Sequence, residues 1–288
     1  MLKRTVTGAC YIAVIVGFFL LRNIDFRLFD LLTFLFCSIG TFEVARAEKN
    51  KTGDVLFVPS VIFGIVFVPT FFLFEYVIAS GCGVIAAFIC VAVFLISALV
   101  IHALYIKNNK DGAKAVLPFA YLPFVYPALP LLAILAVNAL GLTRGFLPLL
   151  LIFVIPPCTD TMAYLVGMTW GKIKKGNVKK LCPVLSPNKT VAGAIGGLAG
   201  GVLGSLILFA IYGLGTFLGT HGGLVFIVAG ALASVATQLG DLFESFVKRR
   251  AGIKDMGKIM PGHGGIMDRI DGMLLAGVVV YVLTLFAL

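Results

Sequence analysis

The chain has 288 residues, of which 60% are hydrophobic and only 12% are charged. Soluble domains carry about 25% charged residues, so this chain cannot cover a water-facing surface with polar side chains. The same composition excludes an intrinsically disordered protein, because disorder goes with low hydrophobicity. The formal net charge is +10, and its sign alone does not distinguish nucleic acid, nucleotides and lipid head groups as partners.

Apolar runs long enough to cross a bilayer recur along the chain. A hydrocarbon core of about 30 Å needs about 20 residues of helix, and about nine runs approach or exceed that length. We therefore predict an all-α fold, a polytopic integral membrane helix bundle, with hydrophobic segments in 1–140 and the chemical motifs in 141–288. Four prolines between 118 and 130 predict a break in the fifth span. The predicted spans are 5–21, 28–45, 55–74, 77–106, 115–140, 145–170, 191–218, 223–247 and 269–287.

Positive charge is concentrated on one side of these spans. With the N-terminus in the cytoplasm, all but three of the 23 Lys and Arg residues fall on the cytoplasmic side, as the positive-inside tendency predicts. The exceptions are Arg22, Arg27 and Arg144. The two most basic loops, 171–190 and 248–269, then share the cytoplasmic side, although topology alone also favours basic residues there.

Acids inside membrane segments are costly, so each is a candidate for function. Asp160, Asp241 and Glu244 are the clearest cases. Asp241, Ser245 and Lys248 share one helix face by their i, i+4, i+7 spacing, and Glu244 lies beside them. An alternative is that Asp241 pairs with a lysine and only holds two helices together.

Two further acids stand where the last helix is expected to begin. Asp268 and Asp271 are three residues apart and share a helix face, although helix capping alone could explain one of them. Together with Asp241 they form the hard oxygen cluster that Mg²⁺ prefers. Lys and Arg of the two basic loops would neutralise phosphate oxygens, and the glycines near His263 would let backbone N–H groups approach an anion.

The other basic loop ends in Ser186-Pro187-Asn188-Lys189-Thr190, which is typical of a turn and helix cap, with Lys189 directed at an anion on the helix end. Glycines at four-residue spacing follow and predict a close-packing ridge between membrane helices. The chain has no Walker-type phosphate loop, which disfavours a motor or pump ATPase. The ridge glycines are Gly193, Gly196, Gly197, Gly200, Gly201 and Gly204.

The run from Ser245 to Asp271 resembles the signature of phosphatidate cytidylyltransferases, also called CDP-diacylglycerol synthases. Asp160 with Ala163-Tyr164 and the 186–190 segment are further family-like pieces in the expected order, so the resemblance covers about 155–288. One departure is Ala192, where the family usually has Glu, so no role of that acid is carried over. The signature residues are Ser245-Phe246-Val247-Lys248-Arg249, Lys254-Asp255 and Pro261-Gly262-His263-Gly264-Gly265-Ile266-Met267-Asp268-Arg269-Ile270-Asp271.

The resemblance implies transfer of a cytidylyl group from CTP to phosphatidic acid, giving CDP-diacylglycerol and pyrophosphate in phospholipid biosynthesis. It implies Mg²⁺ held by Asp241, Asp268 and Asp271, with a second metal ion or a monovalent cation left open. The expected setting is the lipid of a bacterial-type inner membrane, with a cytoplasmic active site, a homodimer and no nucleic-acid partner. The implied catalytic residues are Asp241, Lys248, Asp268 and Asp271, and the implied substrate-binding residues are Asp160, Ser186, Lys189, Ser245, Arg249, His263, Gly264, Gly265 and Arg269.

Two other functions stay open at this point. A related CTP-dependent membrane enzyme could act on another lipid, as an isoprenoid-alcohol kinase or an archaeal-type lipid cytidylyltransferase does, because apolar walls for lipid tails look alike in any membrane helix. A secondary transporter would also carry intramembrane acids and broken helices. Against a transporter, the acids gather at one face of the membrane instead of its midplane.

Overall fold

The computed structural model describes residues 2–52, 54–78, 121–213 and 222–287, together with a few positions between 89 and 107. The regular secondary structure of this part is helical apart from one two-stranded hairpin. It forms two compact units, Met1–Leu142 with Arg250–Ile270, and Thr143–Arg249 with Asp271–Leu288. The loop that carries the glycine-rich signature therefore groups with the N-terminal helices.

The predicted all-α membrane fold is confirmed. Within the described residues, eight helical stretches are long and apolar enough to cross a membrane, against about nine predicted. The predicted span that has no counterpart, 77–106, lies mostly outside the described residues, as does the start of 115–140. The eight stretches are Thr5–Arg22, Phe26–Lys49, Phe57–Tyr76, Leu122–Ala139, Gly141–Ile173, Val191–Tyr212, Gly222–Ala251 and Met267–Phe286.

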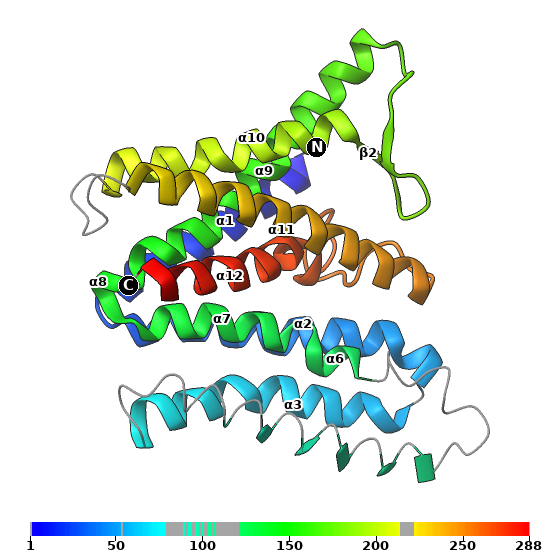
Figure 1. Cartoon of the computed structure of the whole chain (residues 1–288). Helices are drawn as coiled ribbons and strands as arrows, with labels where there is room; N and C mark the ends of the chain where they lie inside the picture. Colours follow the sequence, from blue (N-terminus) through cyan, green and yellow to red (C-terminus); the bar gives the residue numbers. More distant parts are fainter. Residues whose placement is uncertain are drawn as a thin grey trace. The chain divides into compact units, whose positions relative to one another are not determined.

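The first unit is built on α2, which packs against both α3 and α7 (Figure 1). The break predicted from the prolines is seen between α6 and α7, where Tyr126 ends one helix and Pro127 caps the next. The elements of this unit are α1 (Leu2–Arg22), η1 (Phe26–Phe29), α2 (Asp30–Thr52), α3 (Asp54–Phe72), η2 (Leu73–Ile78), α6 (Leu122–Val125) and α7 (Ala128–Ala139), with α8 (Gly141–Arg144) crossing its boundary.

A buried polar network holds the ends of these helices together. Arg22 is 1% exposed and donates to Asn138 Oδ1 at 3.0 Å and to the carbonyls of Gly141 and Leu142 at 2.6 and 3.0 Å. The Asn138 amide in turn donates to Asp30 Oδ1 at 2.8 Å. Charges buried in a membrane protein need such partners, and the network explains how the second span accommodates Asp30.

In the second unit, α9 and α10 run side by side, and the β1–β2 hairpin connects them (Figure 1). Thr190 caps α10, because its hydroxyl accepts the N–H of Gly193 at 3.0 Å. The elements of this unit are α9 (Phe146–Ile173), β1 (Lys180–Cys182), β2 (Ser186–Thr190), α10 (Val191–Leu208), η3 (Phe209–Gly213), α11 (Gly222–Ala251) and α12 (Met267–Ala287). The last two residues of α11 and the first four of α12 belong to the first unit, together with the loop between them.

The glycine ridge on α10 is buried, as the spacing predicts. A Cβ atom on Gly196 would lie 2.5 Å from Val166 Cβ, and one on Gly200 would lie 2.5 Å from Met162 Cβ, both on α9. On the neighbouring face, a Cβ atom on Gly201 would lie 2.6 Å from Ser234 Cβ on α11. The ridge is therefore used within the chain, to bring α10 against two other helices.

We expect Gly200→Ala to destabilise the protein by about 1–3 kcal/mol, because the added methyl group overpacks the α9–α10 contact. Gly17→Ala on α1 is the matched control. Nothing lies within 4 Å of a Cβ atom there, so this change should be neutral or stabilising through helix propensity. Thermal unfolding in detergent measures both, and equal effects would contradict the ridge as a packing device.

Candidate functional site

Helices α11 and α12 approach each other closely where their acids lie. A Cβ atom on Gly240 would lie 2.5 Å from the carbonyl oxygen of Asp271, and one on Gly272 would lie 2.7 Å from Thr237 Cγ2. Glycine at both positions removes the side chains that would separate the backbones. Asp271, on α12, is thereby brought next to the acidic face of α11.

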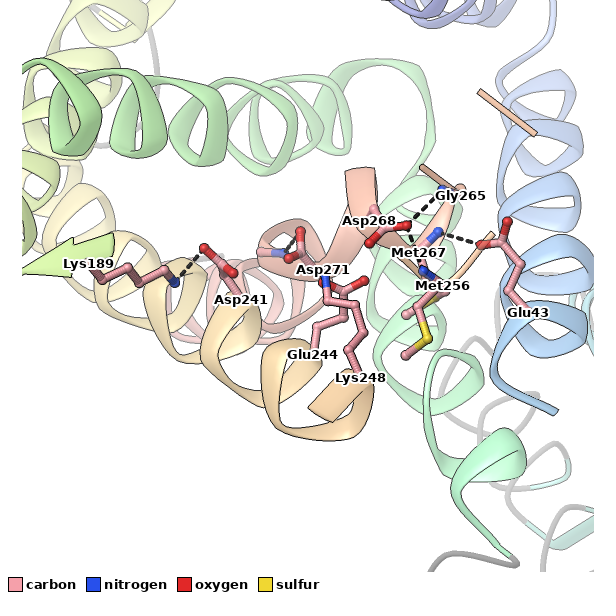
Figure 2. A network of polar contacts seen from close by, with 11 residues as sticks. Glu43, Lys189, Asp241, Glu244, Lys248, Met256, Gly265, Met267, Asp268 and Asp271 are labelled. Carbon is pink, nitrogen blue, oxygen red and sulfur yellow. Dashed lines mark hydrogen bonds and ion pairs between the residues drawn. The ribbon is translucent and has the colours of Figure 1, made fainter. Parts of the chain in front are cut away.

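Three carboxylates meet at this crossing. Ligand oxygens of Asp241, Glu244 and Asp271 all lie within 4.8 Å of one another (Figure 2). Mutual repulsion makes such a group unfavourable unless cations are close. Carboxylate oxygens from two helices are the donors that a hard divalent cation prefers, so this group fits Mg²⁺.

Two lysines neutralise part of this charge. Lys189, from β2, forms an ion pair with Asp241, and Lys248, one turn along α11, forms one with Glu244 at 2.5 Å (Figure 2). Glu244 is 1% exposed, so its charge is almost completely removed from water. The simple pairing considered for Asp241 is present, but three carboxylates face two ammonium groups, and a divalent cation would supply the missing positive charge.

A cavity of about 970 Å³ opens beside Asp241. Its walls come from α9, the β1–β2 hairpin, the start of α10 and the acidic face of α11. They carry two acids and four lysines. This is the size of known ligand pockets, about 300–1,000 Å³, and the excess of lysines suits a polyanion. The polar residues on its walls include Asp160, Lys172, Lys175, Lys180, Ser186, Lys189, Thr190, Gln238 and Asp241.

In the first unit, two carboxylates bind the loop that precedes α12. Asp268 Oδ2 accepts the N–H groups of Met256 at 3.0 Å and Gly265 at 2.7 Å. Glu43, on α2, accepts those of Ile266 at 3.2 Å and Met267 at 2.9 Å, and Figure 2 shows the bond to Met267. One of these donors, Gly265, is among the glycines near His263 that the sequence suggested for an anion.

The predicted site residues thus fall into two groups. Asp241 and Asp271 come together, with Asp160, Ser186 and Lys189 on the adjoining cavity. Asp268, His263, Gly264, Gly265 and Arg269 belong to the first unit, and a metal-ligand role for Asp268 stays a prediction. Ser245 is buried and Arg249 exposed on α11.

Sequence reasoning left two acids out of the site. Glu244 was recognised as an intramembrane acid but not as a ligand, because it stands one residue off the Asp241–Ser245–Lys248 column. Glu43 lies in the predicted span 28–45 and was not singled out as a candidate. The signal that could have found both is the same: a carboxylate inside an apolar segment needs a partner.

Comparison with known proteins identifies the family of this chain. A model of the cytidylyltransferase family matches residues 2–287. The chain belongs to the cytidylyltransferase family. The curated relatives include a protein named phosphatidate cytidylyltransferase from Bacillus subtilis (strain 168), 32% identical over 280 residues, which covers 95% of this chain and 94% of the relative.

Other family relatives match over shorter segments. A phosphatidate cytidylyltransferase of Helicobacter pylori (strain J99) is 34% identical over 193 residues, covering 67% of this chain and 64% of that protein. One of Brucella abortus biovar 1 (strain 9-941) is 40% identical over 137 residues, covering 48% of this chain and 46% of that protein. The chain thus spans about half the length of its Brucella relatives in these alignments.

The buried Glu244–Lys248 pair gives a stability test for this family member. Lys248→Met removes the ammonium group that faces a buried carboxylate, and we expect a loss of about 3–5 kcal/mol in the free energy of unfolding. The double variant Glu244→Gln, Lys248→Met removes both charges and should recover most of that loss. Thermal unfolding measures both, and a double variant no more stable than Lys248→Met would contradict the pairing.

Proposed function

We propose that the protein transfers a cytidylyl group from CTP to phosphatidic acid and releases CDP-diacylglycerol and pyrophosphate. The observation that carries the proposal is the match to the cytidylyltransferase family over residues 2–287, with a full-length relative named for this activity. The arrangement of three carboxylates beside a lysine-rich cavity supports it.

The reaction needs little proton chemistry from the protein. A phosphate monoester oxygen of the lipid attacks the α-phosphorus of CTP, and the bond from that phosphorus to the bridging oxygen of the β-phosphate breaks. The nucleophile is already anionic near neutral pH, since the second pKa of a phosphate monoester is about 6. Catalysis is then mainly positioning and charge neutralisation.

The residues of the second unit supply both. We assign the triphosphate to the cavity beside Asp241, where Lys172, Lys175, Lys180 and Lys189 offset its charge. Asp241, Glu244 and Asp271 would hold Mg²⁺. The chemistry supplied by Mg²⁺ there would be neutralisation of the charge that develops as pyrophosphate departs.

We assign the protein to a bacterial-type inner membrane with the cavity open to the cytoplasm, because the lysine-rich hairpin lies on the side that the positive-inside tendency makes cytoplasmic. A homodimer stays a prediction. The glycine ridge does not favour it, since that ridge is used between helices of one chain.

Purified protein given labelled CTP, phosphatidic acid and Mg²⁺ should form labelled CDP-diacylglycerol. Asp271→Asn should lower turnover at least about 100-fold, because it removes a charge at the proposed metal group. Asp25→Asn, at an exposed acid before η1, is the matched control and should retain turnover. Label in another lipid would favour the related CTP-dependent enzyme, and no product from the wild type would exclude the proposal.

Labelling with a membrane-impermeant maleimide tests the orientation. In a cysteine-free background, Val184→Cys at the hairpin tip and Ile24→Cys between α1 and α2 probe two exposed positions, 90% and 77% accessible. We expect Ile24→Cys to react in intact cells and Val184→Cys only after permeabilisation. The reverse pattern would refute a cytoplasmic cavity.

A further inference from the structure

The glycine-rich loop before α12 has its backbone donors occupied by the protein's own carboxylates. Four N–H groups, those of Met256, Gly265, Ile266 and Met267, are bound by Asp268 and Glu43. Hydrogen bonds from backbone N–H groups to carboxylates are about twice as strong as neutral ones. These donors are therefore committed to holding the loop, and they are not free to bind a phosphate.

The glycines of the loop fit the same explanation. A Cβ atom on Gly257 or on Gly265 would collide with the carboxylate of Glu43. Gly264 has φ +87°, and a Cβ atom there would lie 2.9 Å from Asp268 Cγ. Side chains at these positions would push the loop away from the two acids, so the glycines make room for carboxylates of the chain itself.

Glu43 connects distant parts of the sequence. It lies on α2, is 1% exposed, and accepts the N–H of Ile266 with one carboxylate oxygen and that of Met267 with the other. The bond to Met267 is drawn in Figure 2. Met267, which it binds, begins α12, and Asp268 follows it directly in the first turn of the same helix. A helix turn is stiff, so the position of Met267 constrains the position of Asp268 and of the rest of this first turn.

We propose that Glu43 is a positioning residue of the transferase: it fixes the signature loop and the first turn of α12, and thereby the position of Asp268, which the family resemblance implies is catalytic. The expected effect of Glu43 on turnover rests on the proposed function. Its effect on the structure of the loop does not. Glu43 touches no reacting group in this role. Its contribution is the fixed geometry of residues that do.

Glu43→Gln is the direct test, because it keeps the shape of the side chain and replaces one acceptor oxygen by an NH₂ donor that faces a backbone N–H. We expect kcat to fall about 10- to 100-fold, since displacement of a catalytic group by about 1 Å costs that much. The Mg²⁺ concentration for half-maximal rate should rise, while KM for CTP changes little. Glu75→Gln, at another buried acid of the first unit, is the matched control and should leave all three quantities unchanged.

A second readout needs no substrate. Lys254 and Lys258 are exposed in the loop, and tryptic cleavage after them requires local opening of the backbone. In Glu43→Gln this cleavage should be about tenfold faster or more than in the wild type and in Glu75→Gln. A Glu43→Gln protein with wild-type cleavage and wild-type kcat would overturn the proposal, as would one that is only less thermostable.

Gly257→Ala disturbs the same contact from the side of the loop, because its methyl group would collide with the Glu43 carboxylate. It replaces Glu43→Gln as the test if that variant does not fold. It should reproduce the lower kcat and the faster cleavage, and the effects of the two changes in a double variant should be less than multiplicative. Fully multiplicative effects would overturn a shared contact. Faster cleavage in a protein whose wild type forms no CDP-diacylglycerol would support the loop contact and reject only the proposed function.

Discussion

Close approach of α11 and α12 is the constraint on which the candidate site depends. Gly240 and Gly272 let the two backbones meet, and the meeting brings Asp271 beside Asp241 and Glu244. Like charges at that separation repel, so the arrangement depends on the ion pairs with Lys189 and Lys248, and a further cation would balance the remaining negative charge. Packing and electrostatics oppose each other here, and the packing of small residues prevails.

Glycine serves three separate purposes in this chain. On α10 it lets membrane helices pack, at the α11–α12 crossing it brings acids together, and before α12 it makes room for Glu43 and Asp268. The first purpose follows from a four-residue spacing that sequence makes visible. The third does not, because a glycine-rich loop that surrounds an internal carboxylate has the same sequence as one that surrounds a phosphate.

Much of the fold could be predicted because hydrophobicity over about 20 residues depends only on local sequence. The column of Asp241, Ser245 and Lys248 could be predicted for the same reason, since helix periodicity is local. Glu43 could not be assigned, because its partners lie more than 220 residues away along the chain. Asp268 illustrates an intermediate case: the capping interpretation agrees with its bond to Gly265, three residues earlier.

The hold of Glu43 on the signature loop also limits how the chain can be divided. A fragment that starts after α7 would contain every residue of the family signature and the whole acidic group. It would lack Glu43, whose carboxylate binds Ile266 and Met267. Without Glu43, a side chain at position 257 or 265 would no longer collide with that carboxylate. The substitutions that the loop tolerates therefore depend on α2, which is far from the loop in sequence. We expect substitutions at Glu43 and at the loop glycines to occur together.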